Sequence, residues 1–459
     1  MKIKYLALLL ALCLLLAGCG KSGPDTSVLP PLETAPAKTQ QQGGSYNRSD
    51  PIVIYEETLG NGINFSLYED GRLLLSGGDL TESIVDTQAF KNYKDNITII
   101  ETGDGVSLIG EKVFAKAEKV QKVVIGDSVK KIEYYAFANC AELIQVDFGS
   151  GLTEIADYAF SGCPKLTDVN LGGNITTIGG YTFSGCTGLR NAILGSNIQE
   201  LGNCVFDGCT ALTSLRVGCN VSQAALSNNT KLVSVVLEDT VEHLESRAFS
   251  GCAELQNITF SKNLKTIGDY AFADCTKLKE ALLPDSVTEI GDRVFSGCTA
   301  MMTAKIGENV QSMGELLFSG CKELKTLKCH SSIGTASFKD CEALESVSLS
   351  GTVVSVGSQA FYGCKKLLEV TLPEGVQSIG DRAFYNCEEM RKLSMPSTIA
   401  NVGTEIFYGA KELRTLYYNG SSGTWSKVQK EDNWSKNMPG CMSRINDFKI
   451  KTPKNGKNK

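Results

Sequence analysis

A marker phenylalanine that returns every 23 residues constrains this chain more than any other feature. The markers are Phe114, Phe137, Phe160, Phe183, Phe206, Phe249, Phe272, Phe295, Phe318, Phe338, Phe361, Phe384 and Phe407. Most steps are 23 residues, but the step to Phe338 is 20, and Leu226 takes the marker position 20 residues after Phe206. Fourteen coils therefore follow one template. A fixed period of this length indicates a solenoid.

The residues around each marker explain why such coils would stack. Aliphatic side chains stand five residues before the marker and six, nine and eleven residues after it; around Phe160 these are Ile155, Leu166, Val169 and Leu171. The alternation after the marker predicts a strand with one buried face, and the segment around the marker predicts a second short strand and a tight helical turn. Stacked coils bury these groups in one column. The expected fold is a repeat solenoid, mainly β with short helical turns.

The repeating unit I-G-x-x-A-F-x-x-C-x-x-L-x-x-V-x-L-P resembles the leucine-rich repeat of the BspA-like bacterial surface proteins. The resemblance covers Ile97 to about Tyr418. It implies a leucine-rich repeat rod over residues 96–418. It also implies attachment to host matrix proteins or to other cells, because BspA-like proteins are associated with adhesion.

The first residues are typical of an exported bacterial lipoprotein. Lys2 and Lys4 form a basic start, and an apolar run over residues 6–16 leads into the lipobox-like sequence L-A-G-C, which ends at Cys19. The run is too short to span a bilayer as a helix. We expect a signal peptide over residues 1–18 and lipidation of Cys19; the alternative is a plain signal peptide with a cysteine there by chance.

The segments outside the repeat predict a linker and two caps. Residues 19–50 are rich in Pro, Ser, Thr, Gln and Gly, which predicts a flexible linker behind the anchor. Residues 51–95 alternate like strands and resemble an N-terminal cap, which an open solenoid end requires. Residues 419–459 hold Trp425 and Trp434 and resemble a closing cap, followed by a basic tail.

Eleven of the 17 cysteines stand three residues after a marker. They are Cys140, Cys163, Cys186, Cys209, Cys252, Cys275, Cys298, Cys321, Cys341, Cys364 and Cys387. Stacked coils would bring neighbouring cysteines within range of a disulfide, but parallel side chains in register fit the required torsion poorly. We expect a structural row of buried free thiols; some disulfides or a metal site are the alternatives. Cys329 fills a core position, whereas Cys204, Cys219 and Cys441 lie off the pattern and could be exposed.

Catalytic motifs are missing from the sequence. His243 and His330 are its only histidines, they lie far apart, and no G-x-S-x-G, H-E-x-x-H or P-loop pattern occurs. Cys329 adjoins His330, but a buried cysteine position and its neighbour should point to opposite sides. The net charge of −6 gives no basic nucleic-acid footprint. We expect no enzyme, no cofactor and no nucleic-acid partner.

Outward positions of the long strands carry the candidate binding face. Apolar and basic residues mix there in the middle of the repeat, at Val236, Leu282, Met302, Lys305, Lys325 and Lys328. Such a mixture suits a protein or glycan contact surface, although scattered apolar residues on a β-ladder are also normal.

Together these observations predict a monomeric lipoprotein on the outer side of a bacterial cell membrane. It would bind a protein or glycan partner outside the cell through its solenoid, and it would meet the membrane only through its lipid. A passive envelope spacer is the first alternative. An enzyme or an enzyme-associated carbohydrate binder is the second.

Overall fold

The structure is a computed structural model that describes residues 51–350 and 352–436. The described residues belong to one compact unit. The predicted signal peptide, the lipidation site Cys19, the linker, Cys441 and the predicted basic tail lie outside the described residues. Within the described residues, no helix is long and apolar enough to cross a membrane.

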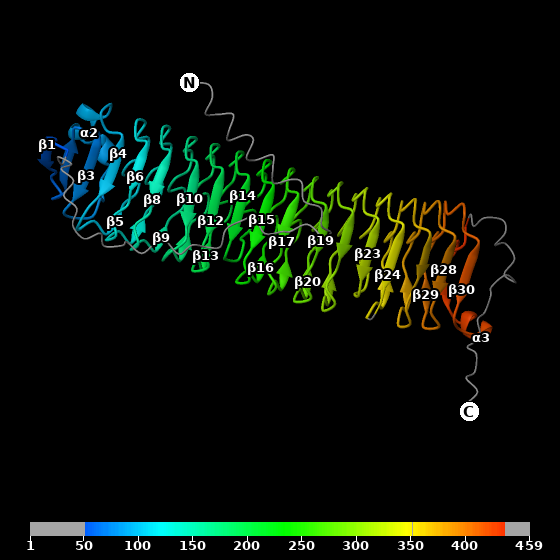
Figure 1. Cartoon of the computed structure of the whole chain (residues 1–459). Coiled ribbons are helices and arrows are strands. Elements are labelled where there is room, and N and C mark those ends of the chain that lie inside the picture. The colour runs from blue at the N-terminus through cyan, green and yellow to red at the C-terminus, as the bar shows by residue number, and fades with distance from the viewer. Residues whose placement is uncertain (1–50, 351, 437–459) are drawn as a thin grey trace, which may run out of the picture. The chain divides into compact units, whose positions relative to one another are not determined.

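Stacked coils make up nearly the whole of this unit (Figure 1). Each coil contributes one longer strand to a parallel ladder, which falls into three sheets. The first sheet contains β3 (Arg72–Ser76), β4 (Ile99–Thr102), β6 (Lys122–Val124) and β8 (Gln145–Asp147). The second contains β10 (Asp168–Leu171), β12 (Asn191–Leu194), β14 (Ser214–Val217), β15 (Ser234–Leu237) and β17 (Asn257–Thr259). The third contains β19 (Glu280–Leu282), β21 (Thr303–Lys305), β23 (Thr326–Cys329), β24 (Ser346–Leu349), β26 (Glu369–Thr371), β28 (Lys392–Met395) and β30 (Thr415–Tyr418).

A second parallel ladder of two-residue strands runs along another side of the coils. Its first sheet contains β5 (Leu108–Ile109), β7 (Lys131–Ile132), β9 (Glu154–Ile155), β11 (Thr177–Ile178) and β13 (Glu200–Leu201). The next contains β16 (His243–Leu244), β18 (Thr266–Ile267), β20 (Glu289–Ile290) and β22 (Ser312–Met313). The last contains β25 (Ser355–Val356), β27 (Ser378–Ile379), β29 (Asn401–Val402) and β31 (Gln429–Lys430). The predicted solenoid, with two strands in each coil, is confirmed.

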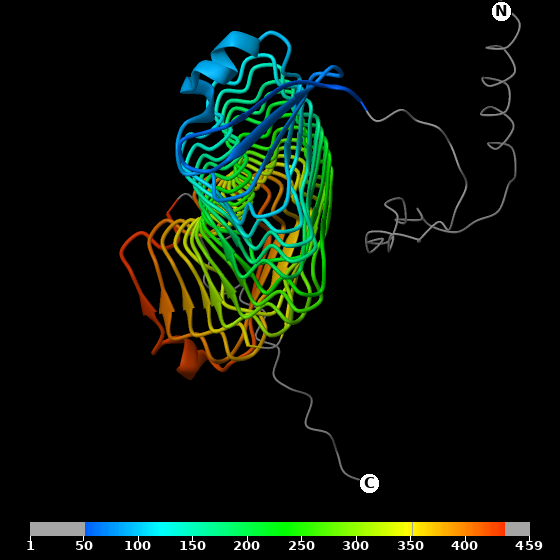
Figure 2. The same cartoon turned by 90° about the vertical axis from the view of Figure 1, so that its left-hand side faces the viewer.

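The N-terminal end adds antiparallel strands and one further turn of the solenoid. The strands β1 (Val53–Thr58) and β2 (Asn64–Tyr68) form a hairpin, and β2 pairs antiparallel with β3. Because β3 pairs in parallel with β4, the stack has about fifteen turns rather than the fourteen counted from the markers. The extra turn escapes the marker pattern because it contains the 3₁₀ helix η1 (Ile84–Asp86) and the helix α2 (Gln88–Tyr93). Figure 2 shows α2 projecting at this end.

The predicted helical turn at each marker is wrong. In every marked coil, the residue two before the marker and the residue two after it have positive φ, as Tyr270 and Asp274 have around Phe272. Two left-handed residues in five cannot continue a helix, so the chain turns sharply instead. Glycine, asparagine and aspartate occupy most of the positions two residues after the marker, because positive φ costs these residues little.

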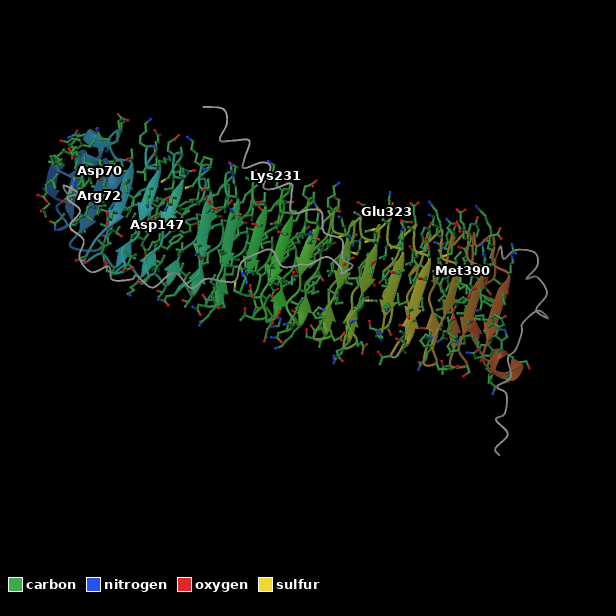
Figure 3. All side chains as sticks on the ribbon, in the orientation of Figure 1. Asp70, Arg72, Asp147, Lys231, Glu323 and Met390 are labelled. Carbon is green, nitrogen blue, oxygen red and sulfur yellow. The ribbon has the colours of Figure 1, made fainter. Side chains whose placement is uncertain are left out.

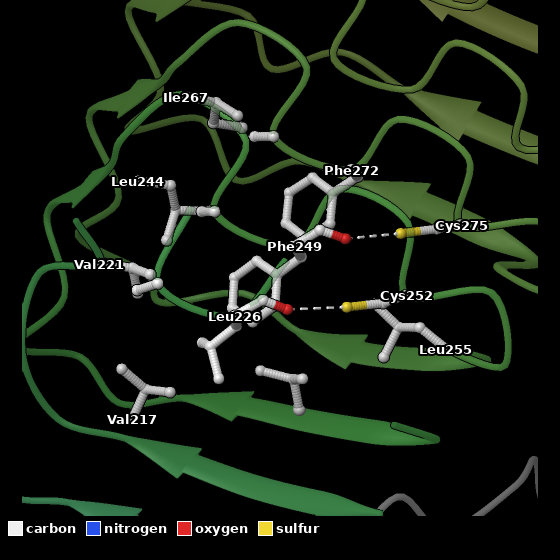
Figure 4. Packing of buried hydrophobic residues seen from close by; sticks show 14 of the residues in the cluster. Val217, Val221, Leu226, Leu244, Phe249, Cys252, Leu255, Ile267, Phe272 and Cys275 are labelled. Atoms are coloured by element: carbon white, nitrogen blue, oxygen red, sulfur yellow. Dashed lines mark hydrogen bonds between the residues drawn. The ribbon is translucent and has the colours of Figure 1, made fainter. Parts of the chain in front are cut away.

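Marker side chains form stacked rows in the core. Rings in adjacent coils lie nearly parallel, with centroids 5.2 Å apart between Phe249 and Phe272 and 5.4 Å apart between Phe272 and Phe295. The markers are buried (Figure 4). Leu226 interrupts the row between Phe206 and Phe249, and it is also fully buried.

Each of the two 20-residue coils lacks three residues between its long strand and its short strand. In the full coils this connection carries an inward aliphatic such as Val241 or Val287. In the short coils a small residue that stands two positions after the long strand's last inward residue is buried instead; it is Cys219 in one coil and Ser331 in the other. Cys219 is therefore not exposed, contrary to the expectation for an off-pattern cysteine. The short-strand ladder is reduced to single bridges here, at Val221 and Ile333, while the long strands pair through both coils.

Aromatic side chains lie against the last turns of the stack. Tyr418 occupies the buried position eleven residues after Phe407, and its ring centroid lies 5.0 Å from that of Trp425. Trp425 ends the short helix α3 (Ser422–Trp425) and also contacts Trp434, at 5.9 Å between centroids. Both tryptophans pack against the hydrophobic core.

Candidate functional site

Five of the six predicted face residues come together on three adjacent strands. Leu282 ends β19, Lys305 ends β21, and Lys328 lies in β23; Leu282 pairs with Lys305, and Lys305 pairs with Lys328. Met302 and Lys325 lie next to each other where β21 and β23 begin, because the Lys325 N–H donates to the Met302 carbonyl at 3.0 Å. The structure therefore gathers these five residues into one patch.

Val236 lies outside this patch. It is half-buried in β15, between Arg216 of β14 and Thr259 of β17. Its strand belongs to the second sheet of the long ladder, while Leu282 begins the third, and the ladder is broken between them. Val236 therefore lies two coils away from Leu282, in a different sheet of the ladder. Ile193, the other aliphatic in this column of the second sheet, is also half-buried.

Leu282 and Met302 are the two apolar groups that the patch exposes. Leu282 is 50% exposed and Met302 is 43% exposed, and six other large hydrophobic residues of the described chain are similarly exposed. The Met302 N–H donates to the carbonyl of Lys279 at 2.8 Å, which sets Lys279 directly beside it. We define the lysine face as Leu282, Met302, Lys305, Lys325, Lys328 and Lys279.

The lysines of this face differ from lysines elsewhere on the coils. In many coils a lysine pairs with a carboxylate 23 residues away, as Lys365 does with Glu342 at 2.8 Å and Lys411 with Glu388 at 2.8 Å. On the lysine face, the Lys305 ammonium contacts Asp285 at 3.2 Å. Lys279, Lys325 and Lys328 are exposed and make no ion pair with any described residue. Three positive charges are thus left beside two exposed apolar side chains.

Sequence reasoning missed Lys279, although a signal was present. Lys279, Met302 and Lys325 all stand seven residues after a marker, so they form one column across three coils. The prediction followed the column ten residues after the marker and added only the nearest apolar and basic neighbours. Reading both columns coil by coil would have found Lys279.

The eleven cysteines of the predicted row lie in a buried line of thiols, which the buried Asn229 interrupts between Cys209 and Cys252. Ten of these thiols donate to the main-chain carbonyl of the residue 26 positions earlier; the Cys275 Sγ lies 3.3 Å from the Phe249 oxygen, and the Cys252 Sγ lies 3.2 Å from the Leu226 oxygen (Figure 4). Cys341, in a short coil, donates to Phe318, 23 positions earlier. All fourteen described cysteines are free thiols, and Cys204 is only half-buried.

Burial is the main influence on the pKa of most thiols in this row, whereas hydrogen bonds with Cys140 and Cys186 lower the pKa of Cys163. Burial raises the pKa of Cys209 and of Cys252 to about 12, because a thiolate would lose its solvation there. Cys219, in the short coil beside them, is likewise raised to a pKa of about 12 by burial. Burial also raises the pKa of Cys275, and the neighbouring Cys252 and Cys298 add to the effect. Thiols held in the neutral form this firmly are poor nucleophiles and poor metal ligands.

Both histidines contact hydroxyl groups of the next coil. His330 Nδ1 lies 2.9 Å from the Ser350 hydroxyl, and His243 Nδ1 lies 2.9 Å from the Thr266 hydroxyl. The Cys329 thiol is buried and donates to the Ser331 carbonyl at 3.3 Å, so no contact between it and His330 is formed. No group of three potential metal ligands occurs among the described residues.

An open cleft of about 680 Å³ lies beside α2, and sequence reasoning missed it. Lysines and acids from residues 83–95 and from the first marked coil line it, and two of the lysines pair with acids, Lys112 with Glu111 and Lys91 with Asp86. Leu80 and Ile109 form a bridge between neighbouring coils, and they are further apart in sequence than one repeat. That extra length was the available signal of an insertion beside the first marked coil.

Comparison with known proteins agrees with this architecture. The family described as BspA type leucine rich repeat region, in six copies, matches residues 83–213, 219–341 and 331–427. A leucine-rich repeat protein from Bacteroides ovatus is 24% identical, with a TM-score of 0.60 over 83% of this chain and 98% of that one. A leucine-rich repeat protein from Eubacterium ventriosum is 22% identical, with a TM-score of 0.37 over 81% of this chain and 91% of that one.

No curated protein matches the sequence. The leucine-rich repeat fold is typical of protein-interaction scaffolds rather than of enzymes. The family match covers most of the described residues, in the segments that form the stacked coils. The chain belongs to the family of BspA-type leucine-rich repeat proteins.

Proposed function

We propose that this protein is a surface lipoprotein that binds a macromolecular partner outside the cell through the lysine face. The supporting observation is the grouping of two half-exposed apolar side chains, Leu282 and Met302, with three lysines that have no ion-pair partner among the described residues. Binding energy in protein interfaces concentrates in a few such groups that lose water on contact. Adhesion to host matrix or to other cells is the role that the family resemblance favours.

The position on the solenoid also supports this function. Buried positions are fixed by stacking, so partner choice must depend on residues that the template leaves free. The lysine face consists of such residues, and the parallel strands β19, β21 and β23 hold them on a rigid ladder. A backbone held this way needs no ordering on binding, so only the side chains lose conformational entropy.

The test is saturable binding of the chain from Asp50 to Lys459 to host matrix and cell-wall fractions. Replacing Leu282, Lys305 and Lys328 by serine should weaken the binding at least about tenfold, since desolvated anchors and their charges are lost. The circular dichroism melt should stay nearly unchanged because all three side chains point outward. Full affinity in the folded variant would move the site elsewhere, and a lack of saturable binding would favour a passive envelope spacer.

The anchor is tested separately. A Cys19→Ala variant should be released from the membrane or should fail to be processed, because the sulfur that would carry the lipid is gone. A variant that fractionates and migrates like the wild type would refute the lipoprotein assignment without affecting the proposed binding face.

A further inference from the structure

We propose that the lysine face accepts an acidic amphipathic helix of a partner protein, lying along β21. This inference rests on the proposed function and specifies the partner. It starts from the order of residues across three coils. In the column at the start of the long strands, Met302 lies between Lys279 and Lys325, with backbone hydrogen bonds of 2.8 Å and 3.0 Å joining the three residues.

Two further lysines lie close to that column, and exposed carboxylates accompany them: Glu280 follows Lys279, and Glu323 follows Lys322. Lys277 stands near Lys279, and Lys322 near Lys325, and both side chains are exposed. Between them the middle coil carries Ala300, which is half-buried. The middle coil therefore presents a strip made of Ala300 and Met302, with Lys305 at its far end. It lies between two coils that carry exposed lysines, which we call the two lysine lines: Lys277 and Lys279 on one side, with Leu282 at their end, and Lys322, Lys325 and Lys328 on the other.

The dimensions of this strip fit a helix. Its two lysine lines are two strand spacings apart, about 10 Å, which is about the width of an α-helix with side chains. From Ala300 to Lys305 the strip is about 17 Å long, which matches about three helical turns. A helix whose apolar stripe meets Met302 and Leu282 would place flanking carboxylates near lysines on both sides.

Backbone pairing excludes an extended peptide bound by strand addition. β21 pairs with β19 on one side and with β23 on the other, so its backbone groups are already satisfied. Strand addition needs a free sheet edge. A helix satisfies its own backbone and can bind through side chains alone.

Charge and apolar exposure together favour a protein over a sulfated glycan. A polyanionic sugar would neutralise Lys279, Lys325 and Lys328, but it would leave the 50%-exposed Leu282 and the 43%-exposed Met302 without apolar contacts. An acidic helix with a leucine stripe satisfies both sets of groups. Charge complementarity and apolar burial then act on the same partner.

The probe is a designed peptide of about fourteen residues, with leucines on one helical stripe and glutamates on both flanks. Its binding to the chain from Asp50 to Lys459 is measured by fluorescence anisotropy. Three comparison ligands are used: a scrambled peptide of the same composition, polyglutamate, and heparin. We expect the striped peptide to bind at least about tenfold more tightly than any of these, because only it satisfies both charge and apolar contacts.

The variant K279E/K325E should weaken binding of the striped peptide at least about tenfold, since each lysine line loses a charge and gains a repelling one. The matched control is K231E/K366E, which reverses two exposed lysines on other coils and should bind as the wild type does. Lys231 lies at the same edge of the stack as Glu323 of the lysine-rich coil, but several coils away from it (Figure 3).

Equal binding of heparin or polyglutamate would overturn the inference in favour of a general anion surface. No binding of the striped peptide, or equal loss in K231E/K366E, would also overturn it. The proposed function would survive either result if the serine variant of Leu282, Lys305 and Lys328 still lost its matrix ligand. If the serine variant instead kept full affinity for its matrix ligand, the proposed function would be refuted, whatever the peptide did.

Discussion

Alkaline conditions should destabilise this protein steeply, because its row of buried thiols is held neutral. Burial raises the pKa of Cys209, Cys219 and Cys252 to about 12. In an unfolded chain, thiols titrate at about 8.5. Between these pH values the unfolded chain releases protons that the folded protein retains. The stability that these thiols confer is therefore complete below about pH 8.5 and is lost as the pH rises toward about 12.

The magnitude follows from proton linkage. Each such thiol lowers the free energy of unfolding by about 1.4 kcal/mol for every pH unit in this range. From about pH 8.5 to about pH 10, one thiol costs about 2 kcal/mol, and Cys209, Cys219 and Cys252 together cost about 6 kcal/mol. A loss of that size is comparable with the whole stability of many domains. The other raised thiols of the row, such as Cys298 and Cys321, steepen the loss further.

The assay is urea unfolding followed by circular dichroism, in reductant, at several pH values between about 8 and 10.5. Cys252→Ala should lower stability at about pH 8 by about 1–2 kcal/mol, since a buried sulfur is removed. It should also reduce the pH slope by about 1.4 kcal/mol per unit. Val287→Ala, at another fully buried position, should destabilise without changing the slope. An unchanged slope in Cys252→Ala would refute the reasoning.

Three further predictions concern the coil template and are checked by thermal and urea unfolding. Phe295→Ala should cost about 3–5 kcal/mol, but Phe295→Leu less than about 2 kcal/mol, because Leu226 already fills a marker position; equal costs would contradict this. Gly162→Ala should cost about 1–2 kcal/mol, since Gly162 has φ +72° and a Cβ there would lie 2.5 Å from the Asn139 oxygen. Lys365→Met should leave stability nearly unchanged, because its ion pair is exposed to water; a clear loss would show that charge ladders stabilise the coils.

The buried half of this structure was predictable from the sequence because stacking imposes the repeat on it directly. Positions such as Ile267, Phe272, Cys275 and Leu278 each face the equivalent residue of the next coil, so the period, the fold and the row of cysteines could all be read from spacing. Positive φ beside the markers was harder to predict, since Tyr270 and the other residues before the markers give no glycine signal. The turn was therefore taken for a helical one.

The candidate face was only partly predictable, because exposure depends on neighbours that the period does not fix. Val236 and Leu282 hold equivalent positions in their coils, yet Leu282 is 50% exposed and Val236 is less exposed. Val236 lies beside the long side chain of Arg216, whereas Leu282 begins a new sheet. Cys219 is buried for a similar reason, since a three-residue deletion draws it inward.

A stacked repeat also explains why the lysines without ion pairs support the proposed binding face. Residues one period apart lie about 4.8 Å apart in backbone, so any charge repeated in the same column meets its own kind in the next coil. Alternation solves this problem, as where Glu342 pairs with Lys365. Lys305 and Lys328 break the rule, because they are direct partners in adjacent strands and carry the same charge, and only Lys305 has a carboxylate partner, Asp285. Like charges placed directly opposite each other on a sheet destabilise it. A bound acidic partner would offset the repulsion between Lys305 and Lys328. We therefore expect the partner's carboxylates to bind most tightly beside these two lysines.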